Sequence, residues 1–171
     1  MTYRHLVAVV TILPLVWPQA LAAAEQTFVA NYRAWSLFTY QDGNDRMCFI
    51  ASEPTRKDGN YTRRGDPALL VTRLPGQADS SEVSMQPGYT FQDGSTVRVV
   101  VDGNQSFELF TQGEYAWTRG AADDQALIAA MRAGIELTAR GTSSRETWSE
   151  DTYSLLGFTA AYTAMQQACR Q

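Results

Sequence analysis

The sequence predicts a mainly β protein, a single-domain antiparallel β-sandwich of jelly-roll or immunoglobulin-like type with two α-helices. Three observations support this class. Short runs rich in β-branched and aromatic residues recur about every ten residues, and Gly, Pro and Asp turn signals separate them. Two segments in the last third of the chain have helical periodicity. The length of 171 residues suits one domain preceded by a targeting segment.

Residues 1–24 have the three parts of a secretory signal peptide. Arg4 provides the positive charge, residues 6–16 form a short apolar core, and small residues at 22–24 offer a cleavage site. We expect cleavage after Ala24, with Ala22 as the alternative, so that residues 25–171 form the working domain. The apolar core is shorter than the about 20 residues that a membrane span needs, and no later stretch is apolar enough to cross a bilayer. The protein is therefore predicted to be periplasmic or secreted.

The titratable residues argue against much catalytic chemistry. The lone histidine, His5, lies in the predicted leader, so the exported chain is expected to lack a histidine for a catalytic triad or a metal site. Lys57 is the only lysine, which argues against Schiff-base catalysis. Lys and Arg number 14 against 18 Asp and Glu, and such an acidic chain does not indicate a nucleic-acid partner. No cofactor and no metal ion is predicted.

The β-strands are expected to begin with a hairpin. Residues 35–40 and 47–51 are strand-like and flank a turn signal at 42–45. Pro-Gly and Asp-Gly pairs then delimit further runs that alternate between apolar and polar residues. These runs predict strands at 68–73, 82–86, 96–101, 107–110, 115–117 and 135–140.

Two helices are predicted near the C-terminus. The first is capped by Asp123 or Asp124, runs to Ala133 and stops at Gly134. The second covers residues 157–168, where apolar residues recur at helical spacing.

The two cysteines, Cys48 and Cys169, predict one disulfide, because an exported chain with an even cysteine count meets an oxidising compartment. Cys169 continues the apolar stripe of Phe158, Tyr162 and Met165, so it should face the core. Since Cys48 lies in a predicted strand, the bond would staple the C-terminal helix over the sheet. Two separate buried thiols are the alternative.

A small polar loop at 141–145 is the candidate for binding an anion or a partner. Arg140, Ser143 and Arg145 offer guanidinium and hydroxyl donors that suit a carboxylate or a phosphate. The favoured interpretation is nevertheless a structural loop in which Arg145 pairs with Asp151, because arginines more often form ordinary ion pairs.

Arg64, Gly65 and Asp66 spell a tripeptide known from cell adhesion, whose mechanism needs a mobile, exposed loop tip. Pro67 and a predicted strand follow at once. Entry into that strand is therefore the favoured interpretation, and adhesion is the alternative.

Carboxylates near the C-terminus leave an enzymatic alternative open. Glu146, Glu150 and Asp151 could serve acid–base catalysis if a cleft brought two of them together. Adjacent carboxylates in a polar loop are more often solvated, or Asp151 caps a turn. No catalytic residue is therefore assigned.

Ten short segments in the same order along nearly the whole mature chain carry a family resemblance: 52–54, 59–67, 82–84, 87–89, 109–111, 116–118, 131–134, 141–145, 151–155 and 157–161. In these segments the chain resembles the invasion-associated locus B family of bacterial exported proteins. The resemblance implies a mainly β periplasmic or envelope protein of alphaproteobacteria with a closing cysteine near its end. The family name comes from pathogen members linked to host-cell entry, and it brings no catalytic residues with it.

Together these observations predict an exported, non-enzymatic envelope protein that binds an envelope protein, a host protein or a small ligand. The alternative is a small periplasmic hydrolase that uses carboxylates or a serine without histidine. Two converging carboxylates of shifted pKa in a cleft would favour the enzyme, and an exposed apolar or aromatic patch would favour the binder.

Overall fold

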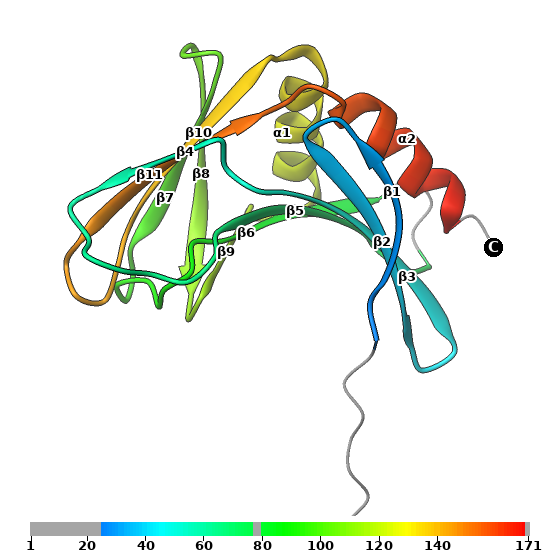
Figure 1. Ribbon diagram of the computed structural model, residues 1–171, viewed down its shortest axis with the longest axis horizontal. Helices are drawn as coiled ribbons and strands as arrows, with labels where there is room; N and C mark the ends of the chain where they lie inside the picture. Colours follow the sequence, from blue (N-terminus) through cyan, green and yellow to red (C-terminus); the bar gives the residue numbers. More distant parts are fainter. Residues whose placement is uncertain (1–24, 77–79, 170–171) are drawn as a thin grey trace, which may run out of the picture.

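Eleven strands form one antiparallel sheet in the computed structural model, which describes residues 25–76 and 80–169. The strands follow the order β1-β2-β3-β5-β6-β9-β8-β7-β10-β11-β4, and every adjacent pair is antiparallel. Their bounds are β1 Thr27–Tyr32, β2 Trp35–Asp42, β3 Asp45–Ser52, β4 Arg56–Gly59, β5 Ala68–Arg73, β6 Ser81–Gln86, β7 Thr96–Val101, β8 Gln105–Gln112, β9 Tyr115–Trp117, β10 Glu136–Thr142 and β11 Trp148–Ser154. The predicted class, mainly β with two helices, is confirmed. The sandwich-like shape comes from one strongly bent sheet (Figure 1). The predicted signal peptide lies outside the described residues.

Alternating burial confirms the strands that the apolar pattern predicts. In β7, Val97, Val99 and Val101 are fully buried, whereas the intervening Arg98 is exposed. The hairpin of β2 and β3 pairs in continuous register from Ser36 opposite Ala51 to the turn. Burial of one face of the strands between the two edges of the sheet is the main stabilising contribution to such a fold.

Helix α1 (Ala121–Ala133) begins one turn earlier than the sequence suggests, and its predicted aspartate cap is wrong. Gly120 occupies the N-cap and makes no side-chain cap bond. Asp124 instead lies in the first turn of α1, and its side chain is buried against the sheet. Its Oδ1 accepts hydrogen bonds from the backbone N of Val83 (2.7 Å) and from Thr118 Oγ1 (2.6 Å). The carboxylate therefore ties α1 to β6, a long-range partnership that local capping rules do not anticipate.

Helix α2 (Phe158–Ala168) packs on β1, β2 and β3, as Figure 1 shows at the red end of the chain. Phe158 meets Trp35 edge to face with ring centroids 4.9 Å apart. Cys48 and Cys169 form a disulfide with their Cα atoms 6.1 Å apart. The bond thus joins the end of α2 to the centre of β3, the staple that the two sequence patterns predict.

Three strands escape the sequence analysis, and two of them, β1 and β4, are the edges of the sheet. The third, β11, overturns the prediction that Glu150 and Asp151 lie in a polar loop or cap a turn. Its inward positions are Ser149, Asp151 and Tyr153, all almost fully buried. Tyr89 and Arg64, from other segments, provide polar partners for Ser149 and Asp151. The hydroxyl of Tyr153 has no hydrogen-bond partner among the described residues. Among the described residues, no helix is long and apolar enough to cross a membrane.

Candidate functional site

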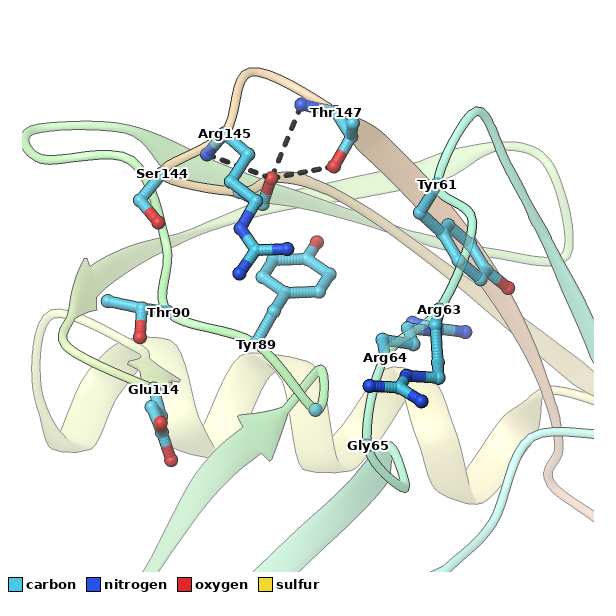
Figure 2. Close-up of a pocket in the computed structure, with 12 residues that line it drawn as sticks. Tyr61, Arg63, Arg64, Gly65, Tyr89, Thr90, Glu114, Ser144, Arg145 and Thr147 are labelled. Carbon is cyan, nitrogen blue, oxygen red and sulfur yellow. Dashed lines mark hydrogen bonds between the residues drawn. The ribbon is translucent and has the colours of Figure 1, made fainter.

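A polar cleft of about 440 Å³ opens where three connecting segments meet near β11 (Figure 2). The segments are 61–65, which follows β4, 88–90, which follows β6, and 143–147, which joins β10 to β11. Glu114 enters from the turn between β8 and β9. The lining residues are Tyr61, Arg63, Arg64, Gly65, Gly88, Tyr89, Thr90, Glu114, Ser143, Ser144, Arg145 and Thr147.

Two glycines let the first two segments cross at close range. The backbone N of Gly65 donates to the carbonyl of Gly88 at 2.8 Å, and Gly88 has φ +78°. A Cβ on Gly88 would collide with the Gly65 backbone. Glycine is thus required at position 88 both for its left-handed conformation and for the contact.

A buried ion pair fixes this crossing to the sheet. Arg64 forms a two-pronged pair with Asp151 of β11, and their side chains are only 3% and 1% exposed. Nη1 of Arg64 also donates to the Pro87 carbonyl at 3.1 Å. Burial lowers the pKa of Arg64, but its interactions with Asp151 and, less strongly, Tyr61 outweigh burial and raise it overall, so the guanidinium stays charged.

The ion pair corrects the prediction that Arg145 pairs with Asp151. Both carboxylate oxygens of Asp151 are engaged by Arg64, a residue 87 positions away. The ion pair also contradicts the cell-adhesion alternative for Arg64, Gly65 and Asp66. Adhesion would need an exposed arginine at a loop tip, whereas the guanidinium of Arg64 is buried. Asp66 precedes β5, the strand entry that the sequence favours.

The 143–147 turn is held by one hydroxyl at its centre. Ser143 Oγ contacts Thr147 Oγ1 at 2.7 Å and accepts bonds from the backbone N of Arg145 (3.2 Å) and of Thr147 (3.3 Å). The backbone N of Ser144 donates to the Thr90 carbonyl at 2.8 Å. Glu146 adopts a left-handed φ of +61°, which is uncommon for a residue with a side chain. Ser143 is therefore a positioning group, and Arg145 stands on a well-ordered turn.

Tyrosines form part of the wall. The guanidinium of Arg64 lies 4.6 Å from the centre of the Tyr61 ring, a cation–π contact. Tyr89 shares a 2.8 Å hydrogen bond with Ser149 of β11, and burial raises its pKa. Burial also raises the pKa of Tyr153 in β11, so both phenols stay neutral at physiological pH.

The exposed charges of the cleft are two arginines and one glutamate. Within the described residues, Arg63 and Arg145 form no ion pair. Figure 2 shows the Arg145 guanidinium reaching from its turn toward Tyr89, with Arg63 beside Gly65 on another side of the opening. Glu114 is the one carboxylate that lines the cleft. No cluster of three acidic, cysteine or histidine residues suited to a metal occurs in the part of the chain that the structure describes.

The structure does not bring all residues of the predicted anion site together. Ser143 and Arg145 line the cleft, Asp151 lies beneath it, and Arg140 lies outside it. Arg140 instead stacks on Trp148 at 4.0 Å and lies 3.6 Å from Glu150.

Seven of the lining residues were not predicted from the sequence as part of a site: Tyr61, Arg63, Gly88, Tyr89, Thr90, Glu114 and Thr147. Tyr89 and Glu114 directly follow Gly88 and Gly113, and Arg63 lies two residues before Gly65; the chain turns or crosses at these glycines. Those glycines are the signal that could have marked the segments.

Comparisons with known proteins place the fold. The family model described as "Invasion associated locus B (IalB) protein" matches residues 35–166. No curated protein matches the chain in sequence. A solved structure, the invasion associated protein B of Bartonella henselae, aligns with a TM-score of 0.60 and 18% sequence identity over 88% of this chain and 100% of that one. At that identity the likeness shows the fold alone. Since the family model spans most of the chain, the protein belongs to the invasion associated locus B family.

Proposed function

We propose that the protein is an exported, non-enzymatic envelope protein that binds a partner or ligand through the cleft around Arg145. The observation that carries this proposal is the charge pattern of the cleft. Arg63 and Arg145 line it without ion-pair partners among the described residues, on a protein whose net charge is −4, so the cleft attracts a negatively charged ligand. The volume of about 440 Å³ lies in the range of small-ligand sites.

Export is part of the proposal. The disulfide between Cys48 and Cys169 suits an oxidising compartment, and the first 24 residues have the sequence of a cleavable signal peptide. The working chain would then be residues 25–171, in the periplasm or outside the cell.

The hydrolase alternative lacks its defining geometry among the described residues. Glu114 is the single carboxylate in the cleft lining, and Asp151 is committed to Arg64. Glu150 lies beside Arg140, which is not part of the cleft lining. A carboxylate pair for acid–base work is therefore not assembled there.

Capture from an envelope extract tests the proposal. The oxidised protein and its Arg145→Gln variant are immobilised, and the retained proteins and small molecules are identified by mass spectrometry. We expect a partner or ligand that the wild type retains and the variant loses. Equal retention by both proteins would remove the cleft from the function, and turnover of ester or glycoside substrates would contradict a non-enzymatic role.

A further inference from the structure

The charge and hydrogen-bonding capacity of the cleft define the chemical group that it recognises. We propose that it binds a ligand through a single carboxylate, held by Arg145 and Arg63. This inference deepens the proposed function and rests on it. Three features of the cleft support it: an arginine on a fixed turn, an unsatisfied buried donor and a carboxylate that lowers the net positive charge.

The backbone of Arg145 has a fixed position at the rim of the cleft. Its backbone N is bonded to Ser143 Oγ at 3.2 Å, in a turn that is itself bonded to Thr90. A guanidinium on a rigid turn loses less conformational entropy on binding than one on a mobile loop. Its planar fork matches the two oxygens of a carboxylate.

The second feature is a donor that the protein leaves unused. The side chain of Arg64 lines the cleft and is 3% exposed, and its Nε has no hydrogen-bond partner among the described residues. A buried N–H of a charged group without an acceptor is costly, and a ligand oxygen satisfies this one only if the cleft wall opens to admit it. The other guanidinium nitrogens already bond to Asp151, which leaves Nε as the free donor.

The charges of the cleft favour a carboxylate over a phosphate. Glu114 lines the same cleft as the two free arginines. Its negative charge repels any anion, and it repels a doubly charged phosphate more strongly than a singly charged carboxylate. The net charge of these three side chains is +1. Their attraction for an anion grows in proportion to the charge of the anion, whereas the cost of desolvating the anion grows with the square of that charge, so a monoanion is favoured.

Titration calorimetry of the oxidised full-length protein tests this inference. The probes are acetyl-dialanine, its C-terminal amide, acetate and inorganic phosphate at one ionic strength. We expect acetyl-dialanine to bind about tenfold more tightly than its amide, and phosphate to bind more weakly than acetyl-dialanine. If acetate binds as tightly as acetyl-dialanine, the ligand is a small free carboxylate. If acetate binds clearly more weakly, the ligand is the C-terminus of a peptide.

Three variants locate the binding in the cleft. Arg145→Gln and Arg63→Gln should each lower the affinity for acetyl-dialanine by about tenfold. Glu114→Gln should raise phosphate binding more than carboxylate binding. Arg56→Gln, an exposed residue on β4, is the matched control and should change nothing. Thermal unfolding of each variant shows that it is folded.

Three results would overturn the inference: equal binding of the acid and the amide, tighter binding of phosphate than of acetyl-dialanine, or no binding of any carboxylate probe. If the envelope capture still yields a partner that Arg145→Gln loses, the proposed binding function stands and only the carboxylate assignment fails.

Discussion

Removing the carboxylate of Asp151 should destabilise the protein severely. In Asp151→Asn, the guanidinium of Arg64 stays charged and buried but loses its counter-charge. Both side chains are at least 97% buried, so water cannot replace the lost partner without opening the cleft wall. Breaking a buried pair in this way costs about 3–5 kcal/mol, a large share of the stability of a typical domain.

Urea unfolding, followed by tryptophan fluorescence with the disulfide intact, measures this cost. The chain carries its own control, because Arg56 and Asp58 form an ion pair whose side chains are 60% and 52% exposed. Asp58→Asn should cost at most about 1 kcal/mol. Equal losses for the two variants, at an unchanged dependence on urea, would refute the assignment of Arg64 and Asp151 as the anchor of the cleft.

Three further predictions concern the rest of the fold. Replacing Cys48 and Cys169 by serine should cost up to about 5 kcal/mol, and hydrogen exchange should show α2 losing protection before β7; simultaneous loss would contradict the staple. Gly88→Ala should destabilise more than Gly94→Ala in urea unfolding, because both have positive φ but the Cβ at 94 meets nothing within 4 Å. Burial and a neighbouring carboxylate raise the pKa of Glu82, so the folded state binds the proton more tightly than the unfolded state. Stability therefore falls as the pH rises above about 4, and Glu82→Gln should raise the melting temperature at pH 7 but not at pH 3.

The sequence could predict the strands whose apolar residues alternate, since alternation reports burial on one face. β7, with valines at 97, 99 and 101, is the clearest case. The same logic misses β11, whose inward positions include Ser149 and Asp151. Their burial depends on Tyr89 and Arg64, partners 60 and 87 positions away, and no local pattern carries that information.

The candidate site could be predicted only in part, because only some of its residues belong to a local feature of the sequence. The turn that carries Ser143 and Arg145 is a local feature, and its polar composition marks it. The wall formed by Tyr61 and Tyr89 depends on the crossing at Gly88, which joins segments that are distant in the chain. Arg64 stands out in the sequence only as part of a tripeptide, whereas its buried partner defines its role in the structure.

The buried pair and the exposed arginines divide two tasks within one cleft. A pair of apolar side chains in place of Arg64 and Asp151 could be as stable as the ion pair, because removing both charges also removes the cost of burying them. Apolar side chains would not reproduce the directed bonds to Asp151 and the Pro87 carbonyl, which set the angle of the 61–65 segment against β11. The Arg64→Met/Asp151→Leu double variant should therefore recover most of the stability lost in Asp151→Asn, yet bind acetyl-dialanine less tightly than the wild type. Stability and affinity recovered together would mean that the pair only fills space. Stability recovered without affinity would mean that binding needs the pair, through its hold on the 61–65 segment or through Arg64 Nε.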